Sequence, residues 1–573
     1  MRVSTLSKLP LFEVLAGHDS RAPAIVHSGA VKGFSYGQLL RDVSKAKDTL
    51  ASYGPNRRRG QRVAFLAENS YDYVVTLLSI LGADGIAVPL SPTFPAKELR
   101  YVLNHSGASM LLSTIRYHEQ AQMVIQEGVK GEVLLKIIDK STEDDGPTPV
   151  EMHWEEPTQV DGGLMLYTSG TTSQPKGVLL PLSAVMAQCQ SLRDAWQYTP
   201  QDRFLHVLPL HHIHGTVNAL LAPLLAGASV EFMFPFAADA VWTRFGGPFS
   251  TPATEDTKGE EKVTVFTAVP TIYNRLLSTH PTLSAEMQRA TREAVAPENL
   301  RLNISGSAAL LTSTKKAWAE LSNANDLLER YGMTETGMIL SCGLAMQDRV
   351  DGSVGWPLPS VEVRLVESDT NEVILPGEEV DRHGHEREGE IHVRGPTVFR
   401  EYWQNPEATR AEFVDADDGR GRWFKTGDIA VRKQIPAAGS GHDEWSRGPM
   451  YFIRGRKSVD IIKTGGEKVS ALEIERELLS LPQIAEAAVV GLESDAWGQK
   501  VAAIVVLDPA HQQTGRPGKK WGPLDMRRAL KDRLVNYKIP QEMRVIERGL
   551  PRNAMGKVNK KALVKEFFGD AKQ

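Results

Sequence analysis

Short apolar runs alternate along this chain with longer stretches in which apolar residues recur at helical spacing. Residues 63–66 form a β-branched and aromatic run, and residues 71–81 carry apolar positions with a helical period. Residues 263–266 and 273–278 repeat the same order of strand and helix. Such alternation predicts parallel βα units with helices on both faces of the sheets. The expected fold class is therefore α/β.

The hydrophobic pattern changes after residue 456. Beyond it the pattern predicts a helix, two strands and a second helix, over residues 470–479, 487–491, 501–507 and 524–534. This is the pattern of a compact α+β module. We therefore expect two domains, a large N-terminal body built from α/β subdomains over residues 1–455 and a small mobile domain over residues 456–573. A large body with a mobile lid suits an enzyme that excludes water from an activated intermediate.

Two kinds of segment depart from this alternation. Four stretches rich in Gly, Pro, Asp, Glu or Thr are expected as surface insertions, at residues 246–262, 367–388, 434–449 and 510–523. The most apolar stretch, residues 217–230, is too short to cross a bilayer and is interrupted by Pro223. The sequence therefore predicts no transmembrane segment.

Composition adds a few limits. The 66 basic and 70 acidic residues give a net charge of −4, so no basic surplus indicates a nucleic-acid or anionic-membrane partner. The two cysteines, Cys189 and Cys342, lie far apart, which argues against a disulfide framework or a structural zinc site. A cytoplasmic protein is the default expectation. Mitochondrial import stays open, because Arg2 and Lys8 precede the first acidic residue, Glu13.

The most informative segment is the loop at residues 167–177, which follows an apolar strand end. Its hydroxyls and its glycine stand together, at Thr168, Ser169, Gly170, Thr171 and Thr172. Such a loop presents backbone N–H groups and hydroxyls to a polyphosphate, and Lys176 adds positive charge. A polar surface turn is the alternative interpretation. The loop is not a Walker loop, because the sequence contains no Gly-Lys-Ser/Thr.

Two further loops carry acidic residues. In residues 329–337, Glu335 stands in a Gly-bounded polar turn and could bind Mg²⁺ through one oxygen. A helix start capped by Thr334 is the alternative there. In residues 423–428, Asp428 could accept hydrogen bonds from the two hydroxyls of a ribose.

Two basic segments follow. Residues 454–466 contain Arg456 and the pair Gly465-Gly466, and glycine is needed where backbone and ligand approach closely. Residues 550–558 contain Lys557 directly after a glycine. Taken alone, this lysine would be an ordinary solvated charge.

These five segments, in this order, resemble the motifs of the AMP-forming adenylating enzymes, the superfamily of acyl-CoA synthetases, luciferases and peptide-synthetase adenylation domains. The resemblance covers residues 164–558. It implies a ligase that uses ATP, Mg²⁺ and coenzyme A. The chain departs from the family at Ser173, where the family's phosphate loop usually has glycine.

The resemblance also implies roles for single residues. It gives Thr168, Ser169, Gly170, Thr171, Thr172 and Lys176 to the phosphates, Thr334 to the α-phosphate, and Glu335 and Thr172 to Mg²⁺. It places Ser307, Tyr331, Gly332, Met333, Asp428 and Arg456 around the nucleotide, residues 458–460 at the hinge, and Gly465 and Gly466 beside the pantetheine path. Lys557 becomes the catalytic lysine of adenylation, where it can stabilise charge as a carboxylate attacks the α-phosphate.

A cluster of histidines, His206, His211, His212 and His214, suggests a metal site at first. No carboxylate or cysteine cluster accompanies it, which disfavours that interpretation. The resemblance instead places His211 beside the acyl pocket.

The substrate follows from a closer resemblance. Residues 206–215, 268–275, 305–310 and 458–466 are similar to the malonyl-CoA synthetases. A second carboxylate needs a cation in the pocket, and arginine is suited to bidentate pairing. Arg275 is the candidate, with Ser305 and Ser307 as hydroxyl donors; a surface arginine on a helix is the alternative.

The expected reaction is therefore malonate activation by MgATP to malonyl-adenylate and pyrophosphate, followed by transfer to coenzyme A with release of AMP. A ligase for short- or medium-chain monocarboxylates is the alternative, and a nucleotide-binding scaffold without turnover is a third possibility. A peptide-synthetase module is disfavoured, because no carrier-protein motif follows the C-terminal domain. The oligomeric state is left open.

Overall fold

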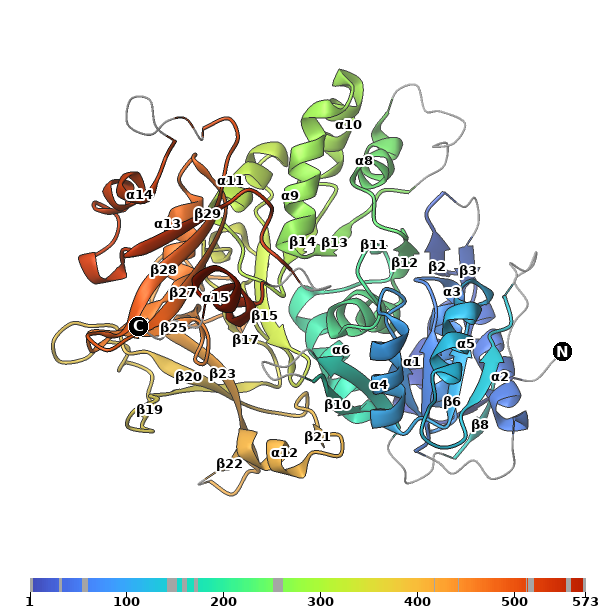
Figure 1. Ribbon diagram of the computed structural model, residues 1–573. Coiled ribbons are helices and arrows are strands. Elements are labelled where there is room, and N and C mark those ends of the chain that lie inside the picture. The colour runs from blue at the N-terminus through green and yellow to red at the C-terminus, as the bar shows by residue number, and fades with distance from the viewer. Residues whose placement is uncertain are drawn as a thin grey trace.

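The computed structural model describes residues 4–29, 33–53, 60–141, 152–156, 162–168, 174–250, 261–416, 418–441, 443–511, 513, 520–552 and 558–569 (Figure 1). Within them the strands form sheets of two, seven, nine, six and five strands. The first four belong to the chain up to Arg456, and the five-stranded sheet follows. This confirms the predicted large α/β body with a small α+β domain after it.

A seven-stranded sheet forms one layer of the large body. Its order is β21 (Glu401–Tyr402), β10 (Lys176–Pro181), β9 (Gly163–Thr168), β5 (Ile86–Pro89), β4 (Arg62–Leu66), β6 (Met110–Ser113) and β7 (Leu134–Ile137). The strands from β9 to β7 are parallel, whereas β10 is antiparallel to β9. Its connecting helices are α3 (Tyr71–Gly82), α4 (Ala96–Ser106) and α5 (His118–Gln126). Parallel strands need such crossover helices, so the sequence alternation is explained here.

A nine-stranded sheet forms the second layer. Its order is β17 (Trp356–Pro357), β16 (Gly337–Ser341), β15 (Leu328–Met333), β14 (Leu302–Ser305), β13 (Val265–Ala268), β11 (Arg203–His206), β12 (Ser229–Phe232), β2 (Pro23–His27) and β3 (Gly33–Ser35). Strands β15 to β2 run parallel. Its helices include α1 (Pro10–Ala16), α2 (Tyr36–Ser52), α6 (Leu182–Trp196), α7 (Ala222–Leu225), α8 (Ala238–Gly246), α9 (Pro270–Thr279), α10 (Ala285–Ala294) and α11 (Thr312–Leu321).

One apolar core lies between the two layers, and another covers a face of the nine-stranded sheet. Trp242, Tyr273 and Trp318 are fully buried under α8, α9 and α11 on one face of the nine-stranded sheet. Phe65 and Trp196 belong to the larger cluster that joins both sheets. Large aromatic side chains bury the most apolar area per residue, so these faces fix how the sheets and helices stack.

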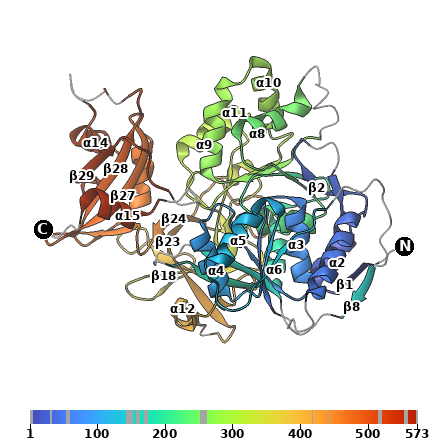
Figure 2. The same cartoon turned by 45° about the vertical axis from the view of Figure 1, so that its right-hand side comes forward.

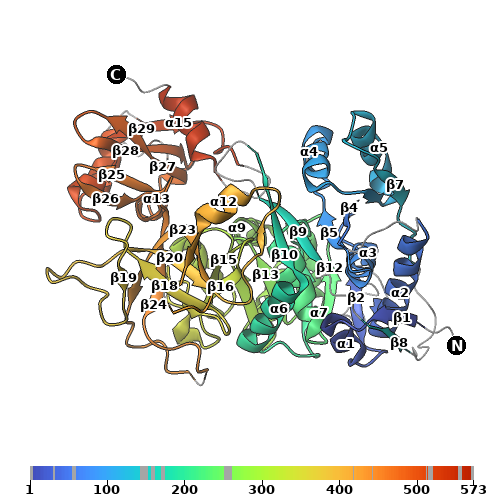
Figure 3. The same cartoon turned by 90° about the horizontal axis from the view of Figure 1, so that it is seen from below.

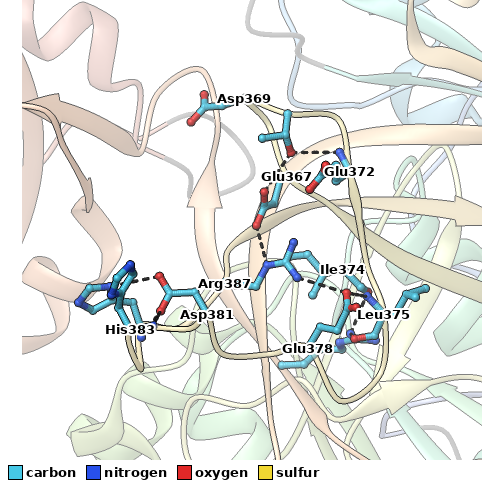
Figure 4. A network of polar contacts seen from close by, with 12 residues as sticks. Glu367, Asp369, Glu372, Ile374, Leu375, Glu378, Asp381, His383 and Arg387 are labelled. Atoms are coloured by element: carbon cyan, nitrogen blue, oxygen red, sulfur yellow. Dashed lines mark hydrogen bonds and ion pairs between the residues drawn. The ribbon is translucent and has the colours of Figure 1, made fainter.

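The rest of the large body is a six-stranded sheet and a two-stranded one. The former contains β18 (Glu362–Val366), β19 (Val373–Ile374), β20 (Gly389–Arg394), β22 (Phe413–Asp415), β23 (Arg422–Lys433) and β24 (Met450–Arg456), with α12 (Pro406–Glu412) beside it; the latter pairs β1 (Ser4–Ser7) with β8 (Met152–Glu155). The predicted insertion at residues 367–388 lies at an edge of the larger sheet. Arg387 lies between Glu367 and Glu378 there, and Asp381 binds the turn of His383 (Figure 4).

The C-terminal sheet has its own core. It contains β25 (Ile461–Thr464), β26 (Glu467–Ser470), β27 (Ile484–Ser494), β28 (Gly498–Leu507) and β29 (Glu542–Ile546), with helices α13 (Ala471–Leu479), α14 (Pro523–Leu530) and α15 (Lys560–Phe568). Ile474, Leu478 and Ile504 are fully buried in it. These elements stand beside the large body at one end of the molecule (Figures 2 and 3). The predicted boundary after residue 455 falls one residue before β24 ends, and as a domain boundary it stays a prediction.

Local differences from the expected elements have simple causes. Helix α9 begins at Pro270 rather than Tyr273, because proline fits the first turn of a helix, where its missing N–H costs nothing. The apolar stretch 217–230 divides into a π-helical segment His214–Leu221, helix α7 and strand β12. No helix in the described ranges is long and apolar enough to span a membrane.

Candidate active site

The candidate residues gather at the carboxyl ends of parallel strands. The loops after β9, β14 and β15 begin at residues 169, 306 and 334 and carry the predicted phosphate-loop, acyl-pocket and magnesium residues. In open parallel sheets this edge is where ligands bind. Residues 169–173 and 553–557 lie outside the described part of the chain, so the predictions for Ser169, Gly170, Thr171, Thr172, Ser173 and Lys557 stay predictions.

The acidic turn after β15 buries Glu335. Its carboxylate accepts a hydrogen bond of 2.9 Å from the hydroxyl of Tyr402, and burial raises its pKa. The ammonium of Lys176 lies 4.5 Å from the centroid of the Tyr402 ring. Tyr402 therefore links the predicted phosphate lysine to the predicted magnesium ligand. Tyr402 could not be predicted as a site residue, because it lies on β21, which is far from Lys176 and Glu335 in the chain and pairs with β10.

The candidate ribose contacts form a second group. The hydroxyl of Tyr331 donates to the carboxylate of Asp428, and one guanidinium nitrogen of Arg456 lies 3.4 Å from both oxygens of that carboxylate. Asp428 and Arg456 face each other across the antiparallel pair β23 and β24. Gly427 has a φ of +75°, the left-handed region that favours glycine, and its carbonyl accepts from Lys457 at 2.8 Å.

A cavity of about 320 Å³ lies at these residues. Its lining comes from β15, β20, β21, α12, β23, the end of β24 and the turn after it, at Met333, Glu390, Tyr402, Glu412, Phe424, Lys425, Thr426, Gly427, Arg456, Lys457 and Ser458. The structure therefore brings Met333 and Arg456, predicted for the nucleotide, to one hollow beside Tyr402. Thr334 is half-buried in the turn next to them.

In the histidine cluster, His206 and His214 are buried, and His211 and His212 are half-buried. Nε2 of His206 bonds the carbonyl of Gly215 at 3.0 Å, and burial lowers the pKa of His206 and of His211 to about 4. His214 lies between Thr267 at 2.7 Å and Ser307 at 3.2 Å, and burial also holds its pKa well below the usual value for histidine. Among the described residues no group of three or more His, Cys, Asp or Glu side chains could hold a metal.

Beside this cluster lies an arginine that the sequence did not single out. Arg330 is only 3% exposed, and Nε, Nη1 and Nη2 have no hydrogen-bond partner in the part of the chain that the structure describes. Burial lowers its pKa to about 9, so the folded protein weakens the charged form. Its charge in turn helps to lower the pKa of His214.

The position of Arg330 follows from strand pairing. Successive side chains of a strand point to opposite faces. Glu329 pairs with Lys315 of α11 at 2.9 Å on one face, so Arg330 points to the other. There it packs against Gly306, where an added Cβ would lie 2.5 Å from the guanidinium carbon. An arginine within the motif at residues 329–337 could have been noticed, but only the pairing register shows which face it takes.

The remaining substrate predictions fall in different places. Arg275 is exposed on α9, and its guanidinium lies 5.5 Å from the centroid of Phe236. Ser305 is buried, and its hydroxyl has no partner among the described residues. Ser307 adopts a φ of +69°, which is uncommon for a residue other than glycine. His211 packs edge-on against Phe94 at 5.8 Å.

The glycines predicted for the pantetheine path form the turn between β25 and β26. Gly465 and Gly466 have φ values of +58° and +87°, and Gly465 donates to the carbonyl of Trp497 at 2.9 Å. The indole of Trp497 is 53% exposed, and an added Cβ on Gly465 would meet its ring at 3.1 Å. These glycines therefore hold an exposed turn on the small domain, as the left-handed backbone requires.

Comparison with known sequences gives the class of the protein. The model of the AMP-binding enzyme family matches residues 12–403, and that of the AMP-binding enzyme C-terminal domain matches residues 473–557. The chain belongs to the AMP-binding enzyme family, and it is an AMP-forming acid–CoA ligase.

Two relatives and one solved structure are similar to this chain over most of its length. A CoA ligase of Gibberella moniliformis is 51% identical, over 99% of this chain and 96% of the relative. The human mitochondrial malonate–CoA ligase is 40% identical, over 89% and 83%. Among solved structures, ATP-bound MatB from Rhodopseudomonas palustris superposes with a TM-score of 0.76 and is 29% identical, over 98% of this chain and 99% of that one.

Proposed function

We propose that this protein is a malonate–CoA ligase. Malonate and MgATP would give malonyl-adenylate and pyrophosphate, and the thiol of coenzyme A would then displace AMP to give malonyl-CoA. The human relative is named for this activity, whereas the relative from Gibberella moniliformis is named only as a CoA ligase. The choice of acid therefore has to rest on the acyl end of the site.

The single observation that supports malonate as the substrate is the guanidinium of Arg330, which has no hydrogen-bond partner among the described residues. A buried cation without an anion is unfavourable, and a carboxylate that enters the site would satisfy it. An acetate or fatty-acid substrate offers no second carboxylate. The neighbouring His206, His214 and Ser307 are polar as well, which suits a short diacid and not an alkyl chain.

Arg275 remains a second proposed partner for the distal carboxylate. It is exposed and lies over an aromatic ring, so it would meet the acid near the surface and not in the interior. Arg330 and Arg275 can be told apart, because the loss of the residue that binds the second carboxylate removes malonate preference, whereas the loss of the other does not.

At the nucleotide end we propose the roles that the family resemblance implies. Asp428 and Arg456 would bind the ribose, and Tyr331 would pack on the face of the adenine. Lys557 would stabilise charge while the carboxylate attacks the α-phosphate. Tyr331, Asp428 and Arg456 already contact one another through Asp428, and each can exchange a contact for ATP. Lys557 acts in adenylation alone in this proposal, since a mobile domain would present it in one orientation only.

The described residues fit Mg²⁺ in one respect. Glu335 offers one buried carboxylate, already hydrogen-bonded to Tyr402, and Mg²⁺ commonly keeps its remaining positions for phosphate oxygens and water. Glu335, with Thr172 as the second predicted ligand, would hold the ion, which would neutralise charge on the phosphates. Tyr402 would keep the carboxylate turned toward them.

The test is a substrate panel on the full-length enzyme. Pyrophosphate release and CoA-thioester formation would be measured with malonate, methylmalonate, acetate, butyrate and octanoate. Malonate should give the highest kcat/KM. A clear preference for butyrate or octanoate would establish the monocarboxylate alternative, and no turnover with any of the five would show that the ligase activates a different acid.

Its location in the cell is a separate proposal. The human relative is named as a mitochondrial protein, and we propose mitochondrial import for this chain over the cytoplasmic default. Fractionation of the tagged full-length protein would decide, and a tag found only in the cytosol would contradict the proposal.

A further inference from the structure

A buried three-residue ion cluster joins the small domain's last helix to the segment that links the two domains. Nζ of Lys560, the first residue of α15, lies 2.6 Å from Oδ1 of Asp460 and 2.7 Å from Oε1 of Glu475 on α13. The three side chains are only 10%, 15% and 14% exposed. Screening by water is therefore weak here, unlike at the many surface pairs of this protein.

Each carboxylate of the cluster also binds backbone. Oδ2 of Asp460 accepts the N–H of Arg456 at 3.0 Å, and Oε1 of Glu475 accepts the N–H of Val489 on β27 at 2.7 Å. Burial raises the pKa of Glu475, and although burial opposes it, the pKa of Lys560 is raised because its two carboxylates favour the charged form. Lys560 thus compensates two acids that would otherwise be buried without a counter-charge.

Asp460 carries the cluster to the nucleotide end of the site. It lies in the turn between β24 and β25, and its own N–H donates to the carbonyl of Arg456 at 2.7 Å. Arg456 in turn contacts Asp428. Gly455 permits this approach, because an added Cβ there would lie 2.5 Å from Cβ of Asp460.

At its other end the cluster reaches the base of the segment that contains Lys557. Arg552 and Val558 form an antiparallel bridge on either side of residues 553–557, and Arg552 pairs with Glu486 at 2.7 Å. Asn559 caps α15 by accepting the N–H of Ala562 at 3.1 Å. Lys560 therefore stands two residues after Val558 of the bridge and three residues after Lys557.

We propose that Lys560 is a positioning residue for adenylation: it ties the chain that carries Lys557 to the Asp460 turn, and so sets Lys557 relative to Arg456. This inference rests on the proposed function. Lys560 touches neither substrate nor nucleotide, and it acts through Asp460 and Glu475. Its loss should slow the first half-reaction, which needs Lys557, far more than the second.

The test uses Lys560→Met in the full-length enzyme, with Lys560→Arg to restore the charge. Lys561→Met is the matched control, because Lys561 is the next residue of α15 and is exposed. Malonate-dependent ATP–pyrophosphate exchange in Lys560→Met should fall about thirtyfold in kcat with KM for ATP within about threefold, which corresponds to roughly 2 kcal/mol. Thioester formation from synthetic malonyl-adenylate should change less than about threefold, and Lys561→Met should behave as wild type.

A second readout does not depend on activity. Hydrogen exchange of the peptide covering residues 547–559 should be faster in Lys560→Met than in Lys561→Met, and Lys560→Arg should restore protection. Equal loss in both half-reactions together with a large fall in Tm would show a purely structural role and overturn the proposal. Unchanged exchange in an active Lys560→Met enzyme would also overturn it. A wild-type enzyme that activates no acid would instead overturn the proposed function.

Discussion

The two ends of the candidate site prepare for their ligands in opposite ways. At the nucleotide end, charges are already matched, because Asp428 lies between Tyr331 and Arg456. At the acyl end, the buried Arg330 has no described partner, and the histidines around it are held neutral. Matched charges keep a general site ready for ATP at small cost. An unmatched charge favours one kind of acid strongly, because the ligand itself must complete it.

The largest expected effect is at the acyl end. Arg330→Met should lower kcat/KM for malonate by at least about a hundredfold, because losing one member of a buried charge pair costs roughly 3–5 kcal/mol. Acetate and butyrate activity should hold or rise, and KM for ATP should stay within about twofold. Steady-state kinetics on the acid panel measure this.

Arg275→Met is the matched variant for that comparison. If malonate activity survives in Arg330→Met and falls about a hundredfold in Arg275→Met, the surface arginine binds the second carboxylate. The acyl end would then owe its selectivity to an exposed residue, and the contrast between a nucleotide end with matched charges and an acyl end with an unmatched buried charge would fail.

The next largest effect is expected at Glu335, the proposed ligand of Mg²⁺. Glu335→Gln keeps the shape of the side chain but removes the charge expected to bind Mg²⁺, so kcat should fall about tenfold to a hundredfold for every acid alike. Titration of Mg²⁺ at saturating ATP should show a higher half-saturating concentration. An unchanged Mg²⁺ response would remove Glu335 from the metal site.

A smaller effect is expected at the ribose contact. Asp428→Asn should raise KM for ATP about tenfold and leave the order of preference among acids unchanged, since Asp428 contacts Tyr331 and Arg456 and makes no hydrogen bond to the guanidinium of Arg330. Measuring KM for ATP with malonate and with butyrate tests both statements. A change of acid preference would show that the two ends are coupled.

The smallest effect on activity is the pH response of the buried histidines. Because burial lowers the pKa of His206 to about 4 and lowers that of His214 well below its usual value, both should stay neutral from pH 6 to 8 and add no step to the rate profile. In the unfolded chain they bind a proton below about pH 6.5. Stability should therefore fall as pH drops from about 6.5 toward 4, and His206→Gln should reduce that slope in denaturant titrations.

Much of this site was predictable from the sequence because its chemistry is local. The strand-like run before Thr168 and the turn around Glu335 combine apolar strands with polar loops, and the structure shows strand β9 ending at Thr168 and the Glu335 turn at the carboxyl end of β15. The helix α3 matched its expected range within one residue, because its apolar period is regular and Ser70 caps it.

The groups that sequence reasoning missed are the ones that depend on pairing across the fold. Tyr402 reaches Glu335 only because β21 joins β10. Arg330 stands in a motif that was recognised, yet its importance comes from facing Gly306, which directly follows the adjacent strand β14. Arg275 was chosen for its charge and its place in a segment similar to the malonyl-CoA synthetases; the fold shows that its side chain is exposed, and its role at the second carboxylate stays a prediction.

Gly306 has a consequence for engineering the choice of acid. The guanidinium of Arg330 occupies the space that a side chain at this position would need, with only 2.5 Å between its central carbon and the ideal Cβ. A single methyl group, introduced by Gly306→Ala, would therefore push the cation aside without altering its charge. A library that varies position 306 in size could retune selectivity gradually, whereas replacement of the arginine would switch it off at once.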